Sequence, residues 1–136
     1  MIYSPSDAGT WNSVVGGPVP VNVNFCLAAT VEKESEKVQA FTNAMWRSMQ
    51  FIKKSSPEQI LDTIERFVGS TSRGANLLEI GELKDVADWN GLITPESYAR
   101  GEKVWYSELT GIKQPIKLED VAADKFLKAA HAKYPA

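Results

Sequence analysis

The side chains that most often carry catalysis are scarce in this sequence, which holds one histidine and one cysteine. His131 lies near the C-terminus beside Lys128 and Lys133. The helix dipole favours a cation in the last turn of a helix, so we interpret His131 as a solvated helix-end residue rather than a general base. Cys26 lies between two apolar residues with no histidine close in sequence to activate it, and we expect a buried structural thiol.

Other patterns that support chemistry are missing from the sequence. It has no Ser/His/Asp arrangement, metal-ligand spacing or dinucleotide fingerprint, and Gly16-Gly17 lacks the Lys-Ser/Thr that a phosphate loop needs. Paired carboxylates lie on polar faces, where solvated surface explains them better than acid–base catalysis; the pairs are Glu32/Glu34, Glu79/Glu82 and Asp85/Asp88. We therefore predict that the chain is not an enzyme and binds no metal or cofactor.

Three residues are candidates for ligand contacts. Trp11 lies in a segment rich in Gly, Ser and Asn with no apolar stripe to join, and an aromatic ring on a loop can stack on a ligand. Asn22 and Asn24 lie on the face of a predicted strand opposite its apolar face, where a buried amide needs a partner. The other interpretation of both asparagines is the solvent-facing side of an edge strand.

The composition limits the class of protein. With 136 residues, 43% of them hydrophobic and 24% charged, the chain matches one globular domain. Fifteen basic and seventeen acidic residues give a net charge of −2, a balance that argues against a nucleic-acid binder. No apolar run reaches the roughly 18 residues of a membrane span, and residues 1–5 show no export signal.

One strand stands out from the rest of the pattern. Residues 1–18 are rich in Ser, Pro, Gly and Asp and predict a loop or cross-over segment, closed by a turn at Gly16-Gly17-Pro18. Apolar residues then occupy every odd position from Val19 to Ala29, a period of two that predicts a strand with one buried face. Pro20 favours an edge position for it.

Four or five helices are predicted after this strand. The first spans about residues 34–53, with an apolar stripe formed by Val38, Phe41, Met45, Met49 and Ile52. Ser56, Pro57 and Gln59 form a capping box that opens a second helix ending at Gly69. A third carries Leu77 to Trp89 and ends at Gly91; a fourth opens at Thr94-Pro95 and carries Trp105; a last one, from about Glu119, places Val121, Phe126 and Leu127 inward.

A single strand leaves both of its edges unpaired, which a stable fold does not tolerate. Either the loop-like ends supply a second strand or the missing strands belong to another chain or another part of the protein. Self-association through residues 19–29 is therefore a natural hypothesis.

The order of these elements resembles a known family. A strand ending in small residues precedes the helix that reads Val38-Gln39-Ala40-Phe41-Thr42-Asn43-Ala44, and Ser55-Ser56-Pro57-Glu58 opens the next helix. Asn90-Gly91-Leu92-Ile93-Thr94 and Leu118-Glu119-Asp120-Val121 follow further along. Together, over about residues 19–127, they resemble the C-terminal portion of solute-binding proteins of nitrate/sulfonate/taurine importers and their thiamine-pyrimidine-precursor relatives.

The resemblance implies a helix-rich α/β fragment of the type II periplasmic-binding-protein fold, with one or two strands and four to five helices. Residues 1–18 would form the cross-over and residues 19–136 part of the C-terminal lobe. It also implies binding of a small anionic or heterocyclic solute, such as sulfonate, nitrate, taurine or a pyrimidine precursor. The full-length family works with an ABC permease in the periplasm or another extracytoplasmic space, and much of its ligand cleft lies outside a chain of this length.

Two other functions compete with solute binding. The related pyrimidine-precursor synthase uses a histidine and a cysteine-rich site, which one histidine and one cysteine do not match. The other is a helical oligomerisation or interaction domain with no small ligand, driven by the unpaired strand.

Overall fold

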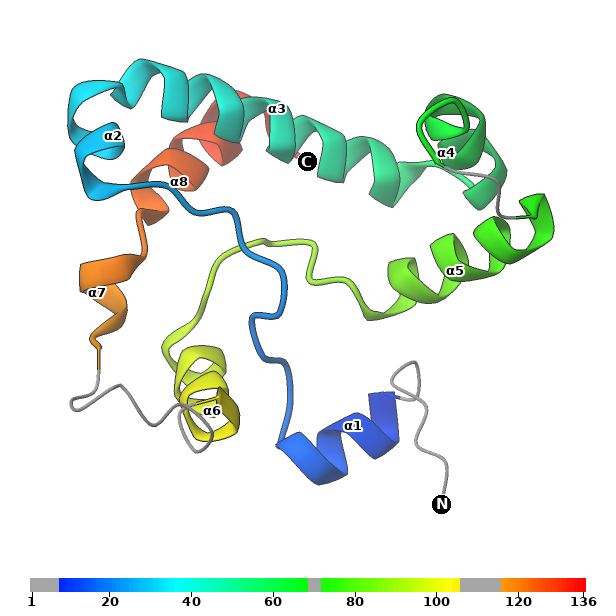
Figure 1. Cartoon of the computed structure of the whole chain (residues 1–136), viewed down its shortest axis with the longest axis horizontal. Coiled ribbons are helices and arrows are strands. Elements are labelled where there is room, and N and C mark those ends of the chain that lie inside the picture. The colour runs from blue at the N-terminus through cyan, green and yellow to red at the C-terminus, as the bar shows by residue number, and fades with distance from the viewer. Residues whose placement is uncertain (1–7, 69–71, 106–115) are drawn as a thin grey trace.

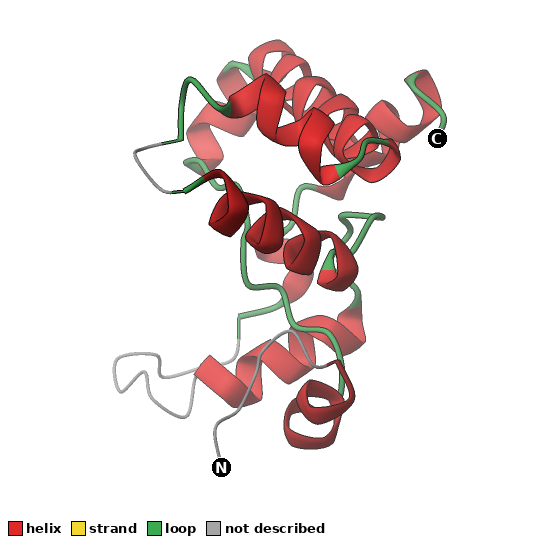
Figure 2. Ribbon diagram, turned by 90° about the vertical axis from the view of Figure 1, so that its right-hand side faces the viewer, coloured by secondary structure: helices red, strands yellow, loops and turns green. Residues whose placement is uncertain are grey.

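The computed structural model describes residues 8–68, 72–105 and 116–136, and these residues form an all-α structure (Figures 1 and 2). The helices are α1 (Ala8–Val15), α2 (Ala28–Lys33), α3 (Ser35–Lys54), α4 (Pro57–Ile64), α5 (Arg73–Val86), α6 (Pro95–Trp105), α7 (Leu118–Val121) and α8 (Asp124–Lys133). The described residues contain no strand, so the predicted α/β fold of the periplasmic-binding-protein type is wrong.

The predicted strand is an unpaired extended segment. Residues 18–27 cross the molecule between α1 and α2 without a neighbouring strand, and Ala28-Ala29 already belong to α2 (Figure 1). The odd-numbered side chains are not buried: Phe25 is 92% exposed and Val23 is 52% exposed. Cys26 is also exposed, so the expected buried thiol is wrong. Alternation specifies which face of a strand is apolar, but a strand forms only where a second strand satisfies its backbone, and the described residues offer none.

The predicted N-terminal loop contains a helix. α1 covers Ala8–Val15, and the two glycines that follow it, Gly16 and Gly17, take positive φ values of 84° and 133°. Glycine adopts these angles without the steric cost that a Cβ brings. The Nε of Arg100 on α6 then donates a 2.9 Å hydrogen bond to the carbonyl oxygen of Pro18, which ties the start of the extended segment to α6.

The helix expected over residues 34–53 is confirmed as α3, and it packs along α8 (Figure 1). Trp46 on α3 is only 4% exposed, and Phe126 and Ala130 on α8 are buried with it. The amide of Gln39 adds a 2.9 Å bond to the carbonyl oxygen of Phe126. The predicted core stripe is wrong in part, because Phe41 is exposed: α8 covers the face of α3 around Trp46 instead.

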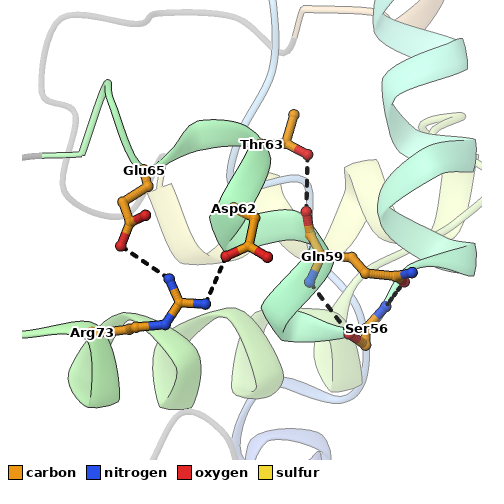
Figure 3. A network of polar contacts seen from close by, with 6 residues as sticks. All are labelled: Ser56, Gln59, Asp62, Thr63, Glu65 and Arg73. Atoms are coloured by element: carbon orange, nitrogen blue, oxygen red, sulfur yellow. Dashed lines mark hydrogen bonds and ion pairs between the residues drawn. The ribbon is translucent and has the colours of Figure 1, made fainter.

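The pair formed by α4 and α5 follows from local sequence chemistry. Ser56 caps α4, its Oγ accepting from the Gln59 N–H at 3.3 Å while the Ser56 N–H donates to Gln59 Oε1 at 2.9 Å, as the sequence predicts. Ile60 and Leu61 are buried. Figure 3 shows Arg73 at the start of α5 reaching two carboxylates of the α4 segment; its partners are Asp62 at 2.6 Å and Glu65 at 3.0 Å.

A turn after α5 redirects the chain toward α8. The third helix ends at Val86, so Trp89, predicted inside it, lies in the loop that follows. Gly91 has a φ of 71°, and a Cβ there would meet Leu127 and Met49 at 3.3 Å. Thr94 and Ser97 then cap α6 with two reciprocal 3.1 Å bonds.

The last predicted helix is confirmed only in part. Phe126 is buried as predicted, whereas Val121 is 57% exposed because the helix is broken into α7 and α8. The helix predicted to end at Gly69 is too long, because α4 ends at Ile64 and residues 65–68 form a turn and a bend. Gly69 and Gly111 themselves, and the side chain of Trp105, lie outside the described residues.

The core is thin for a chain of this mass. Only five hydrophobic side chains of the described residues are buried: Trp46, Ile60, Leu61, Phe126 and Ala130. Several large apolar side chains of the described residues are exposed instead, among them Phe25, Leu27, Phe67 and Leu78. The described helices therefore leave apolar surface uncovered.

Candidate functional site

One hollow gathers aromatic and charged side chains from three parts of the chain. It is a shallow depression of about 550 Å³, largely open to solvent, and we call it the tryptophan hollow. Its principal lining residues are Trp46 and Lys53 of α3, Asp88, Trp89 and Asn90 of the turn after α5, and His131 of α8, with Pro135 and Ala136 beside them. Its volume equals that of small-molecule sites in proteins, roughly 300–1,000 Å³, but such sites enclose most of their ligand, whereas this depression leaves one side of a ligand in solvent.

The inner wall of the hollow is aromatic. The rings of Trp46 and His131 lie 4.0 Å apart between centroids and are tilted by 42°. The indole N–H of Trp46 donates a 2.8 Å bond to the carbonyl oxygen of Tyr134, which fixes the plane of the indole. Trp89 is half-buried and lies on the loop rather than on a helix. Trp46 is buried behind His131, so the accessible aromatic surface of the hollow for a planar ligand is the ring of Trp89.

His131 differs from the sequence-based expectation of a solvated helix-end cation. Its side chain is half-buried against Trp46, and its Nε2 is buried without a hydrogen-bond partner among the described residues. A buried polar atom of this kind ordinarily finds a protein or ligand partner, since leaving it unpaired costs free energy. The expectation is wrong because the contact with Trp46 joins positions far apart in the sequence.

The rim of the hollow is polar. Asp88 Oδ1 accepts a 2.9 Å bond from the backbone N–H of Asn90, so part of its acceptor capacity is already used. Lys53 lies in the last turn of α3, where the helix dipole favours a cation. The lining side chains offer one ammonium, one carboxylate, one amide, one imidazole and two indoles, of which the Trp46 indole is buried. They lack the adjacent nucleophile and base that covalent catalysis requires.

The three ligand-contact candidates from the sequence do not line the tryptophan hollow among the described side chains. Trp11 belongs to α1, and its side chain is outside the described residues. Asn22 and Asn24 are exposed on the extended segment, and neither lines the tryptophan hollow. Sequence reasoning misses the hollow because it places Trp89 inside a helix. The sequence Asp88-Trp89-Asn90-Gly91 does indicate a turn at this position, because Asp, Asn and Gly are typical turn residues.

Two further classes of site are absent from the described residues. They contain no group of three or more His, Cys, Asp or Glu side chains arranged to hold a metal ion. They also contain no helix that is both long and apolar enough to cross a membrane.

Comparisons with protein-family models, with curated proteins and with solved structures gave no match.

Proposed function

We propose that this chain binds a small anionic or heterocyclic solute in the tryptophan hollow and serves as a substrate-binding component of an importer. The observation that carries the proposal is the convergence of Trp46, Trp89, Lys53 and His131 on one hollow of about 550 Å³. Indole faces suit a planar heterocycle, and an ammonium suits a sulfonate, carboxylate or nitrate.

The importer part of the proposal rests on the sequence resemblance of the helical segments at residues 38–44, 55–58 and 118–121 to the nitrate/sulfonate/taurine binding proteins. The strand that begins the resembling order does not form among the described residues. A binding protein of this kind works with an ABC permease in the periplasm or another extracytoplasmic space. The two-lobed α/β fold is not part of the proposal, since the described residues form no sheet.

The hollow also predicts which part of the solute each group contacts. The Lys53 ammonium, placed at the rim, pairs with the anionic group. The half-buried ring of Trp89 contacts the planar or apolar part, and Trp46 supports His131 from behind. The unpaired Nε2 of His131 gains a partner if the solute or a rotation of the imidazole brings an oxygen or N–H to it.

A thermal-shift screen tests solute binding. A ligand that binds only the folded state stabilises it by RT ln(1 + [L]/Kd), about 2.7 kcal/mol at a hundred times Kd. Sulfonates, taurine, nitrate, bicarbonate and pyrimidines form the panel. At least one should raise the melting temperature in proportion to the logarithm of its concentration. No shift across the panel at high concentration would contradict the proposal.

A second candidate function is self-association as a helical interaction domain. Its specific support is the set of large apolar side chains that the described residues leave exposed, such as Phe25, Leu27 and Phe67. A second copy of the chain would remove them from water, as homodimer interfaces do. Light scattering after size-exclusion chromatography tests it: an oligomeric mass supports self-association, and a monomer across about a hundredfold dilution contradicts it.

A further inference from the structure

We propose that the extended segment 19–27 is a docking strand that pairs antiparallel with the same segment of a second copy of this chain, about a two-fold axis at Val23. The inference deepens the second candidate function, self-association, and is independent of solute binding.

The backbone of the segment is unsatisfied. From Val19 to Cys26, no backbone N–H or carbonyl group has a hydrogen-bond partner among the described residues. The segment is nevertheless anchored at both ends: the Pro18 carbonyl accepts from Arg100, and the Leu27 carbonyl accepts from the Thr30 N–H at 2.9 Å. The chain bends at Asn22, and Pro20 has no N–H to donate, so pairing straightens this stretch and uses the remaining unpaired donors and acceptors, as strand addition does at a sheet edge.

The side chains match this backbone. The odd positions carry exposed apolar groups, which are Val21 (65% exposed), Val23, Phe25 and Leu27 (77% exposed). Asparagines occupy positions 22 and 24 on the other face. In a strand with this alternation all the apolar side chains point to one side. Pairing of two such strands therefore creates a continuous apolar face.

The pattern is also complementary to itself. The midpoint of segment 19–27 is Val23, and antiparallel pairing about it places Val21 opposite Phe25 of the second copy and Asn22 opposite its Asn24. Every apolar position then faces an apolar one, as an isologous two-fold interface requires. No residue between Gly16 and Thr30 is charged, so the segment lacks the charges that normally prevent edge pairing.

A two-stranded ribbon alone is marginal in water and needs a helix to cover one face. The segment leads into α2, which packs against α3. α3 carries exposed Phe41, Met45 and Phe51 on the face that α8 does not cover. Apolar surface for covering such a ribbon is therefore present in the same chain.

The native cysteine provides the control for a cross-linking test. Antiparallel pairing about Val23 sets the two Val23 Cα atoms about 4.5–5.5 Å apart, within the 4.4–6.8 Å that a disulfide spans. The two Cys26 residues are then offset by six positions, about 20 Å along the ribbon. The double variant Val23→Cys, Cys26→Ser in a glutathione redox buffer should form a covalent dimer, and the wild-type chain should not.

Both proteins retain the full chain, and circular dichroism checks that their helix content is equal. A covalent dimer of the Val23→Cys variant alone supports the pairing. Cross-linking through native Cys26 as well indicates a parallel register and overturns it. An oligomeric mass without cross-linking at position 23 overturns the pairing but leaves self-association standing. A monomeric mass with no cross-linking overturns both.

Discussion

The indole nitrogen of Trp46 donates a 2.8 Å hydrogen bond to the carbonyl oxygen of Tyr134, a residue 88 positions further along the chain. This bond joins α3 to the residue that ends α8. It also forms the inner side of the tryptophan hollow, because Trp46 contacts His131 as well. Stability of the α3–α8 pair and the geometry of the hollow therefore depend on the same side chain.

Replacing Trp46 with phenylalanine should lower the free energy of unfolding by about 1–3 kcal/mol, because the Tyr134 carbonyl loses its donor and the smaller ring leaves a gap. Chemical denaturation monitored by circular dichroism measures the change. Tyr134→Phe is the matched control, since it keeps the backbone carbonyl that Trp46 contacts. Equal stability of the Trp46→Phe and wild-type proteins would contradict the role assigned to the bond.

Removal of the Ser56 hydroxyl should destabilise the chain through the capping box of α4. Ser56→Ala leaves the Gln59 N–H without its acceptor and should cost about 1 kcal/mol. Ser48→Ala is the control: its hydroxyl donates only to the Ala44 carbonyl within α3, and alanine is a better helix former. Thermal unfolding should separate the two variants, and a loss at Ser48 as large as at Ser56 would argue against the cap.

Gly91 and Gly81 should respond in opposite directions to alanine. Gly91→Ala forces a side chain into a φ of 71° and against Leu127 and Met49 at 3.3 Å, so it should lower the melting temperature. Gly81 lies inside α5, where an added Cβ would meet nothing within 4 Å, and Gly81→Ala should stabilise by about 0.5–1 kcal/mol. Stabilisation at both positions would mean that the turn after α5 is not held as described.

Acid should weaken the start of α4 through Glu58. Its own backbone N–H, and then the Ser56 hydroxyl, lower the pKa of Glu58 below the ordinary 4.5. Because the folded-state pKa is the lower one, the ionised carboxylate stabilises the fold above pH 4.5, and that stabilisation is lost as pH falls through the folded-state pKa.

Glu58→Gln should therefore reduce the melting temperature at neutral pH and flatten its decline below pH 4.5. Glu58→Asp keeps a carboxylate and should retain the acid-dependent decline. Melting curves recorded from neutral to acid pH measure both effects. An unchanged slope in the glutamine variant would contradict this account of α4.

Local chemistry explains what the sequence predicts well. Ser56, Pro57 and Gln59 define a helix start through contacts within four residues, and the structure confirms it. The period of Val38 to Ile52 likewise predicts α3 to within about a turn. These features need no information from distant parts of the chain.

Pairing between distant residues explains what the sequence does not predict. The alternation from Val19 to Leu27 describes a strand, but whether it forms depends on a second strand that no described residue supplies. The tryptophan hollow depends on the contact between His131 and Trp46. The sequence around either residue gives no sign of this contact. The sequence around Lys53 indicates only a cation at the end of a helix. Trp89, which lines the same hollow, lies in the turn after α5, two helices further along the chain.

Isothermal titration calorimetry with the best ligand of the panel tests the central claim most directly, using the wild-type chain, Lys53→Gln and Lys54→Gln. Both lysines end α3, but only Lys53 lines the tryptophan hollow. The account predicts that an anionic solute binds the wild-type and Lys54→Gln proteins with similar Kd, and binds Lys53→Gln about tenfold more weakly, equivalent to about 1.4 kcal/mol. Equal loss in both variants, or undiminished binding to Lys53→Gln, would contradict it.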